Sequence, residues 1–307
     1  MTRPNPRRLA VARALFDMSR PEQVLLMAVV YSFGGAVAVN LAPGEPPSPT
    51  AFALSFLAFV PTALAIHYAN EYADYETDVQ ADRTPFSGGS GALSRTGLSP
   101  ELARRAMVVS GGVGVVAAVA ALLSGVLSLP AFVLLVVVGV VGVQYSIPPL
   151  RLVWRGYGEV TNAVLGGLLL PAYGYAVVSE TVPTTAAATF LPFAVLVFSN
   201  LLATHWPDRA PDGTVGKRTL SVRWSSRRLR RTYWLSLLVG YGSHVLLGVS
   251  GLVPWVVVFA GLPALPFSVW GGVRYTRVRS PLPAVAAMVV FVSAQTLVWV
   301  WLPFART

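Results

Sequence analysis

The segment HYANEYADYETD, residues 67–78, gathers acidic side chains in a chain that has few charges elsewhere. Only 12% of all residues are charged, whereas four of these twelve are Asp or Glu. Asn70, Asp74 and Asp78 follow one another at intervals of four residues. On a regular helix this spacing turns each side chain by about 40° and raises it by about 6 Å, so we expect all three along one face. Stacked carboxylates repel each other, so the segment indicates a cation site.

A second acidic cluster, HWPDRAPDGTVGKRTL at residues 205–220, repeats the four-residue spacing. Asp208 and Asp212 form the pair, and Lys217 and Arg218 follow shortly after. Oxygen ligands with open positions are typical of Mg²⁺, which keeps several waters and bridges carboxylates to substrate phosphates. Basic side chains nearby then suit the remaining phosphate charge. For one cluster alone a solvated loop is an equal alternative, but two matched clusters predict a diphosphate bound through Mg²⁺.

Histidine and cysteine offer little to a softer metal. The chain has no cysteine, and its three histidines lie far apart in the sequence. Oxygen is therefore the expected ligand for any divalent ion. His67 and His205 each stand three residues before a motif, at Asn70 and Asp208. They either assist proton removal from an acceptor or are polar residues that are hydrogen-bonded near a helix end.

The elements that position these motifs are expected to be membrane helices. Hydrophobic residues make up 54% of the 307 positions, and the mean hydropathy is +0.62. A bilayer-spanning helix needs about 20 mostly apolar residues. Nine runs meet this length once flanking residues are added: Gln23–Leu41, Ala51–Tyr68, Ala106–Val126, Ala131–Tyr145, Val160–Val178, Ala186–Thr204, Tyr233–Val249, Val253–Trp270 and Ala284–Pro303. The prediction is an all-α bundle of nine transmembrane helices.

The basic residues predict how this bundle is oriented. All but one of the 23 Lys and Arg residues precede the first run or lie in alternate loops, and the exception is Arg306. Positive charge marks the cytoplasmic side, so we expect a cytoplasmic N-terminus, a basic segment at residues 1–20 and both acidic motifs at the cytoplasmic face. The net charge of +10 is then explained by topology and by anionic lipid head groups, and no nucleic acid is expected as a partner. A cell-membrane protein with many spans is predicted.

The motifs resemble those of the UbiA superfamily of membrane prenyltransferases. Asn70, Asp74 and Asp78 match its Asn-Asp-x-x-Asp-x-x-x-Asp signature, with Glu71 where Asp is common. The DRTPFSGGSGAL segment looks like the loop that follows in this family. Asp208-x-x-x-Asp212 before GKRTL is similar to its second motif, and YSIPPLRLVWRGYGE, residues 145–159, is similar to the loop after its fourth helix.

The resemblance implies a single prenyltransferase domain over residues 1–307, in which two Mg²⁺ ions bridge the diphosphate of a polyprenyl substrate. It implies Asp74 and Asp208 as catalytic residues. The metal ligands it implies are Asn70, Asp74, Asp78, Asp208 and Asp212. The diphosphate-binding residues are Arg83, Arg151, Lys217 and Arg218, and the residues considered for the acceptor or its proton are Tyr145, His67 and His205.

The acceptor is the less determined part of this prediction. GKRTL and the YSIPPLRL loop look most like the dihydroxynaphthoate prenyltransferases of menaquinone synthesis. The expected reaction is therefore prenylation of 1,4-dihydroxy-2-naphthoate, an aromatic quinone precursor. Prenylation of 4-hydroxybenzoate, a glycerol-phosphate lipid or a carotenoid is the alternative within the family. A transporter is the alternative class, and it normally carries ionisable groups at mid-membrane depth, where these apolar runs have almost none.

Overall fold

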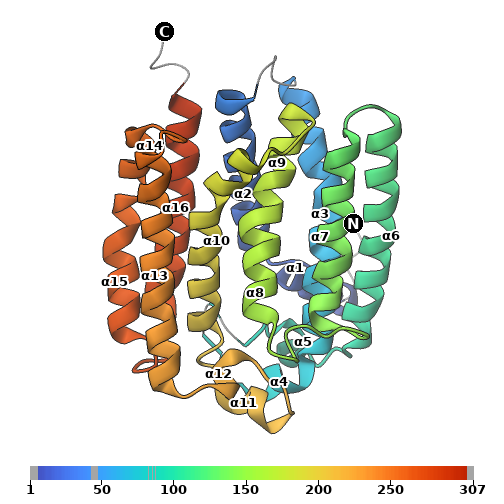
Figure 1. The fold of residues 1–307 in the computed structure, drawn as a ribbon. Helices are drawn as coiled ribbons and strands as arrows, with labels where there is room; N and C mark the ends of the chain where they lie inside the picture. Colours follow the sequence, from blue (N-terminus) through green and yellow to red (C-terminus); the bar gives the residue numbers. More distant parts are fainter. Residues whose placement is uncertain (1–5, 43–47, 82, 85, 87, 303–307) are drawn as a thin grey trace.

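Long helices that run side by side make up the molecule, as the predicted all-α class requires (Figure 1). The computed structural model describes all residues except 1–5, 43–47, 82, 85, 87 and 303–307. The longer elements are α1 (Pro6–Ser19), α2 (Pro21–Leu41), α3 (Pro49–Ala73), α6 (Glu101–Leu123), α7 (Leu129–Ser146), α8 (Gly158–Val164) with α9 (Leu170–Ser179), α10 (Thr184–Thr204), α13 (Ser226–Val249), α14 (Trp255–Ala260) with α15 (Leu265–Arg274), and α16 (Leu282–Trp301). Four short helices gather at one end of the bundle: α4 (Tyr75–Gln80), α5 (Ala92–Thr96), α11 (Arg209–Thr214) and α12 (Leu220–Arg223).

Eight helical segments of the described chain are long and apolar enough to cross a membrane. They coincide with eight of the nine predicted runs. The ninth run, Tyr233–Val249, lies in α13, which stands among the other helices in Figure 1. Gly, Ser, Tyr and His residues interrupt its apolar stretch, and arginines fill its first two turns. The chain therefore crosses the membrane several times, and the exact number of nine stays a prediction.

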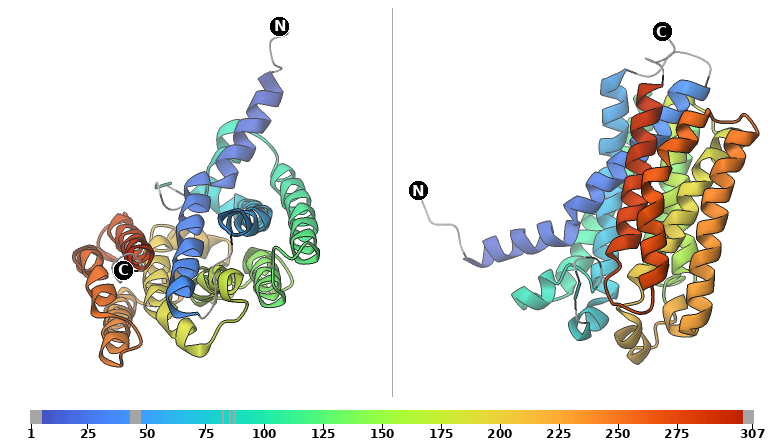
Figure 2. Two further views of the ribbon diagram at one scale, coloured as in Figure 1. Left: turned by 90° about the horizontal axis from the view of Figure 1, so that it is seen from above. Right: turned by 90° about the vertical axis from the view of Figure 1, so that its left-hand side faces the viewer.

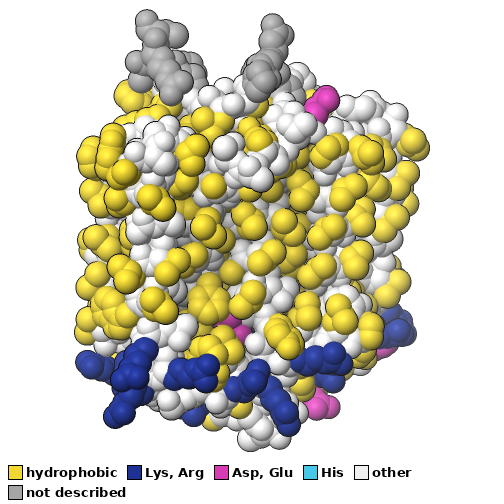
Figure 3. All heavy atoms as spheres, in the orientation of Figure 1, with side chains coloured by type: hydrophobic (Ala, Val, Ile, Leu, Met, Phe, Trp, Pro, Cys, Tyr) yellow, Lys and Arg dark blue, Asp and Glu magenta, His cyan; other side chains and the backbone are white. Residues whose placement is uncertain are grey.

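Packing in the bundle places α10 inside and α6 outside. In α10, 67% of the most apolar window is buried within the protein, against 11% in α6. α3 packs mainly on α6, α2 on α9, and α10 on α13. Aromatic side chains pack together near the start of α3, where the rings of buried Tyr31 and partly buried Phe52 stack with centroids 4.4 Å apart. The outer helices leave apolar side chains for lipid, as the yellow belt in Figure 3 shows.

Prolines and caps end the helices where the sequence suggested. Ser128 caps α7 by accepting the Ala131 N–H at 3.4 Å, and Pro130 stands in its first turn. The turn between α6 and α7 thus separates the predicted runs Ala106–Val126 and Ala131–Tyr145. The run that begins at Val253 is interrupted, since a short 3₁₀ segment, Leu262–Ala264, separates α14 from α15. Proline cannot continue a regular helix, and Pro263 and Pro266 stand at these junctions.

The N-terminal segment is itself helical. α1 leaves the bundle sideways before α2 rises through it, as the two views of Figure 2 show. The change of direction occurs at Arg20, whose backbone is left-handed at φ 49° and ψ 64°. Pro21 then begins α2 with a fixed φ. Within the predicted basic segment at residues 1–20, Pro6–Ser19 thus form a helix that projects sideways from the bundle, and residues 1–5 lie outside the described part.

Positive charge gathers at the end of the bundle that carries the short helices. On the face drawn in Figure 3, Lys and Arg side chains form a band below the apolar belt. This arrangement agrees with the loop charges read from the sequence. The orientation of the N-terminus toward the cytoplasm stays a prediction.

Candidate active site

The first acidic motif lies at the junction of α3 and α4. The expectation of one regular helix through Asn70, Asp74 and Asp78 is wrong at Asp74, where α3 ends and the backbone turns to φ −100° and ψ 7°. The Thr77 hydroxyl donates to the Asp74 carbonyl at 2.7 Å, which competes with regular helical bonding at this position. Backbone hydrogen bonds still join Asp74 to Asn70 and Asp78 to Asp74, at 2.9 and 2.8 Å. The three residues therefore stay in sequence around a bend.

Lys217 joins the two acidic motifs. Its Nζ lies 3.0 Å from Asp74 Oδ2 and 3.4 Å from Asp212 Oδ1, and all three side chains are buried. Asn70 adds to the group by donating from Nδ2 to Asp74 Oδ2 at 3.0 Å and to Ser146 Oγ at 3.2 Å. Burial acts to lower the pKa of Lys217, but Asp74 and Asp212 outweigh it and raise that pKa above its usual value. Lys217 is thus held as a cation between the motifs.

Burial and neighbouring carboxylates raise the pKa values of the other aspartates in the two motifs. Burial raises the pKa of Asp78 to about 8, with Asp74 and Glu71 adding to the effect. Burial likewise raises the pKa of Asp212 to about 6, while Lys217 opposes the shift. The pKa of Asp208 is also raised, mainly by burial. More cationic charge than Lys217 supplies is needed to hold all these groups ionised.

The donor set fits Mg²⁺. Asp74 Oδ1, Asp208 Oδ1 and Asp212 Oδ2 are buried and have no hydrogen-bond partner among the described residues. Among the described residues, no three acidic or histidine side chains lie close enough together to hold a metal ion by themselves. Mg²⁺ is usually bound through one or two carboxylates together with waters and substrate phosphates, so a preformed cage is not required. The free oxygens belong to both motifs.

Glu71, which lies inside the first motif, is engaged in a network of its own. It forms a buried ion pair with Arg20, whose Nη2 also donates to Asn70 Oδ1 at 3.3 Å. The other end of the network is Ser90, whose backbone N–H and hydroxyl donate to the two Glu71 oxygens at 2.8 and 2.7 Å. Glu71 therefore ties the α1–α2 corner and the loop before α5 to the motif. Sequence reasoning missed Arg20 and Ser90, because nothing local marks a pair separated by 51 residues.

The glycine-rich loop after α4 lies over both motifs. Gly88 donates its N–H to Asp208 Oδ2 at 3.3 Å, while Gly89 lies against the Asp78 carboxylate. Arg83 donates to the carbonyls of Gly88 and Gly89 at 3.1 and 2.9 Å, so its guanidinium braces the loop. The structure thus brings Asp78, Asp208 and Arg83 to one place from three segments.

Arg151 and Arg218 lie on the other side of Lys217, next to Trp154. The Arg151 guanidinium stacks on the Trp154 ring at 3.9 Å, and its Nε has no partner among the described residues. The Arg218 side chain is exposed, and its backbone N–H donates to the Trp154 carbonyl at 2.9 Å. Tyr145 is within electrostatic range of Lys217 and Asp212. Lys217 Nζ itself lies 6.0 Å from the centre of the Trp154 ring, and Trp154 is an addition that the sequence analysis did not make.

The two histidines have different partners. His67 Nδ1 lies 2.8 Å from the Ser19 carbonyl, so it faces α1. His205 Nδ1 lies 3.0 Å from Glu159 Oε1, which also accepts the Leu220 N–H at 2.9 Å. Glu159 raises the pKa of His205 against the effect of burial, which acts in the opposite direction. His205 therefore stands beside the second motif in a fixed orientation, whereas His67 joins α3 to the N-terminal helix.

Most of the chain matches one protein family. The model described as the UbiA prenyltransferase family matches residues 28–302. The chain belongs to the UbiA prenyltransferase family. It is therefore an enzyme, a prenyltransferase of the membrane. The resemblance read from the two motifs is confirmed at the level of the family.

Solved structures of UbiA-type enzymes share the fold. A UbiA homologue from Archaeoglobus fulgidus bound to GPP and Mg²⁺ has a TM-score of 0.68 at 13% identity, covering 94% of this chain and 99% of that one. The same protein bound to DMAPP and Mg²⁺ gives 0.67 at 14%, covering 93% and 98%. A digeranylgeranylglyceryl phosphate synthase gives 0.64 at 11%, covering 94% and 99%. The comparison with curated proteins found no match. Identity this low shows the fold alone.

Proposed function

We propose that this UbiA prenyltransferase transfers a polyprenyl group from its diphosphate to 1,4-dihydroxy-2-naphthoate, with Mg²⁺, at the cytoplasmic face of the cell membrane. The observation that carries the proposal is the meeting of both acidic motifs at Lys217, each with a carboxylate oxygen that has no hydrogen-bond partner among the described residues. Asn70, Asp74 and Asp78 would hold metal from one side, and Asp208 and Asp212 from the other. The Archaeoglobus fulgidus homologue, which binds GPP and Mg²⁺, supports this use of the site.

The chemistry required is loss of diphosphate from an allylic carbon. The C–O bond breaks, and its electron pair leaves with the diphosphate. Mg²⁺, when bound, would supply charge that stabilises the leaving group. Lys217 contributes a fixed ammonium, and Arg83, Arg151, Lys217 and Arg218 would bind the phosphate oxygens of the diphosphate, because ammonium and guanidinium groups suit them. Asp74 and Asp208 are the catalytic pair, one from each motif.

The allylic cation is then captured by an electron-rich ring. A new carbon–carbon bond forms and the bond from the ring to the carboxyl carbon breaks, so the carboxylic acid form of the acceptor loses carbon dioxide and one proton. Among the residues considered for this proton, His205 is held by Glu159 beside the second motif, and Tyr145 lies near Lys217. His67 points to the Ser19 carbonyl and is the least suited of the three.

The choice of acceptor rests on the GKRTL and YSIPPLRL segments, which resemble the naphthoate branch. The fold does not select it, since a digeranylgeranylglyceryl phosphate synthase has the same architecture. The other acceptors of the family, 4-hydroxybenzoate, glycerol-phosphate lipids and carotenoids, therefore serve as competitors in the test. Inside the membrane, the lipid tail of the prenyl substrate would lie against the apolar helices.

The test uses the full chain in lipid nanodiscs with a polyprenyl diphosphate, Mg²⁺ and each acceptor in turn, and mass spectrometry follows the product. We expect prenylated, decarboxylated naphthoquinol that disappears with EDTA and in Asp74→Asn and Asp208→Asn. Turnover of another acceptor alone would overturn the naphthoate assignment and keep the metal site. Full turnover with EDTA, or in both variants, would overturn the site.

A further inference from the structure

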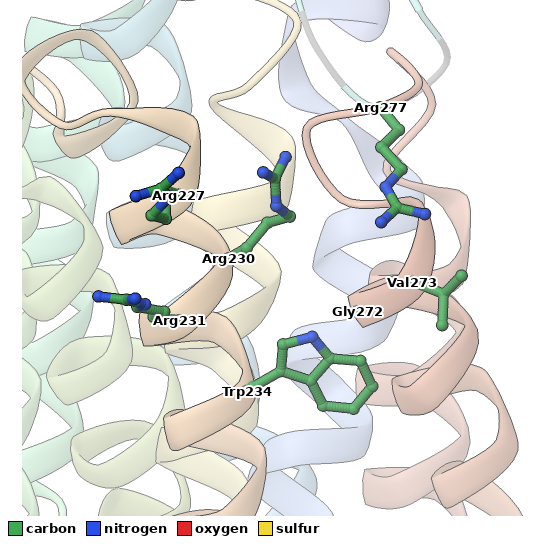
Figure 4. A pocket seen from close by; sticks show the side chains of 7 residues that line it. All are labelled: Arg227, Arg230, Arg231, Trp234, Gly272, Val273 and Arg277. Atoms are coloured by element: carbon green, nitrogen blue, oxygen red, sulfur yellow. The ribbon is translucent and has the colours of Figure 1, made fainter.

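A basic cleft lies apart from the carboxylate site, between α13 and α15. It has a volume of about 550 Å³ and is lined by Arg227, Arg230, Arg231, Trp234, Gly272, Val273 and Arg277. The cleft exists because α13 packs mainly on α10, whereas α15 packs on α16, so the two helices touch each other little. Figure 4 shows Arg230 and Arg277 on opposite sides of the gap with Trp234 between the helices.

No acidic side chain of the cleft lining neutralises its positive charge. Its lining contains four arginines and no acidic residue. Arg230 donates to the Thr276 hydroxyl at 2.6 Å, but no hydrogen bond or ion pair joins Arg231 or Arg277 side chains to any other described residue. The first turn of α13 has no acidic residue either, although a helix N-terminus is itself positive. Topology explains basic residues in this loop, but it does not explain why four arginines line one cavity.

The surface next to the arginines is apolar. Trp234 is 41% exposed and its ring packs against Gly272, where a Cβ would come within 2.6 Å of it. Further along the same two helices, Leu238 is 71% exposed and Val269 is 42% exposed. The ligand that matches this pattern is anionic at one end and apolar along its length. Tryptophan is enriched at this membrane depth, where one end of a side chain is apolar and the other is wet.

We propose that the cleft between α13 and α15 binds one anionic phospholipid, with its phosphate headgroup among Arg230, Arg231 and Arg277 and its acyl chains along α13 and α15. Basic pockets between membrane helices on the cytoplasmic side are suited to such head groups. The volume is sufficient for a headgroup, since ligand pockets typically measure about 300–1,000 Å³. A free phosphate would use the guanidinium groups but would leave the apolar surface without a function.

The first experiment measures lipid binding to the delipidated chain by native mass spectrometry, with EDTA present so that the carboxylate site does not retain diphosphates. We expect tighter binding of phosphatidylglycerol than of phosphatidylcholine with the same acyl chains. In R231Q/R277Q the phosphatidylglycerol affinity should fall about 25-fold, since each arginine near an anionic lipid contributes about a fivefold factor. The matched control is R104Q/R105Q, which also removes two charges from the basic end and should change the affinity less than about twofold.

Two outcomes would overturn the proposal. One is unchanged phosphatidylglycerol affinity in R231Q/R277Q. The other is binding of inorganic diphosphate to the same cleft as tightly as the lipid, because that would make it a free-anion site. Should R231Q/R277Q fail to fold, W234F gives an independent reading: brominated phosphatidylglycerol should quench less tryptophan fluorescence in W234F than in the unchanged protein, and equal quenching contradicts the lipid's position.

Discussion

Lys217 Nζ lies 3.0 Å from Asp74 Oδ2, so a residue that follows the second acidic motif neutralises a carboxylate of the first. The same ammonium is 3.4 Å from Asp212, and both carboxylates are buried. Lys217 therefore occupies the place where the two motifs would otherwise repel each other. A variant without this ammonium therefore tests how much the stability of the site depends on the charge of Lys217.

Lys217→Met should lower the free energy of unfolding by about 3 kcal/mol, because it leaves two buried carboxylates without their cation. Thermal unfolding in nanodiscs measures this. Added Mg²⁺ should raise the unfolding temperature of the variant more than that of the unchanged protein, since a divalent ion replaces the lost charge. Lys217→Arg is the matched control and should keep most of the stability. Identical unfolding of Lys217→Met and the unchanged protein, with and without Mg²⁺, would contradict the role of Lys217.

Asp208→Asn should reduce the rate of prenyl transfer by at least about 100-fold. Loss of a residue that only supports a metal ligand usually costs about 10- to 100-fold, and a catalytic residue should cost more. The substitution keeps an oxygen for the Gly88 N–H and removes only the charge. Steady-state turnover at saturating diphosphate is the measurement. Glu76→Gln is the matched control, because Glu76 is an exposed carboxylate on α4. A similar loss in both variants would mean that general surface charge, and not the site, is responsible.

Glu71→Gln should lower stability by about 3 kcal/mol without changing the Mg²⁺ concentration needed for half-maximal activity. The reason is that both Glu71 oxygens are used by Arg20 and Ser90, so the side chain has little capacity left for metal. Asp74→Asn is the comparison, and it should raise the Mg²⁺ requirement. If Glu71→Gln raises the requirement as much as Asp74→Asn does, Glu71 is a metal ligand and its network has been misread.

Gly89→Ala should reduce activity by more than Gly97→Ala does. Both glycines have left-handed backbones, with φ at 63° and 64°, so alanine strains each by about 1–2 kcal/mol. A Cβ at Gly89 would collide with the Asp78 carboxylate, whereas a Cβ at Gly97 meets nothing within 4 Å. The difference in turnover between the two variants therefore isolates the contact of the loop with the motif. Equal turnover would show that the loop moves aside freely.

Much of this architecture could be predicted from local patterns. Helix ends are marked by residues such as Ser128 and Pro21, and both aspartate motifs are visible as four-residue repeats. The break at Asp74 could not be predicted, since it depends on which group accepts the Thr77 hydroxyl. The pairing of Lys217 with Asp74 depends on how α4 and α11 pack against each other, and this tertiary contact cannot be inferred from a single sequence.

His205 and Glu159 illustrate the same limit. His205 was open to two interpretations, proton transfer or a hydrogen bond near a helix end, and the structure shows its bond to Glu159 at 3.0 Å. Glu159 lies in the first turn of α8, at the end of the YSIPPLRLVWRGYGE segment, and nothing in that segment marks it as the partner of His205. Buried polar pairs between distant segments are satisfied only when the fold is complete.

The charge of Lys217 affects whether a metal ion is needed for folding or only for turnover. Because an ammonium already lies between Asp74 and Asp212 and offsets part of their negative charge, we expect the new chain to pack its helices before any divalent cation arrives. In the proposed reaction the ion would then come with each diphosphate and leave with it. Scarcity of magnesium in the cell would slow turnover, while the amount of folded enzyme stayed the same.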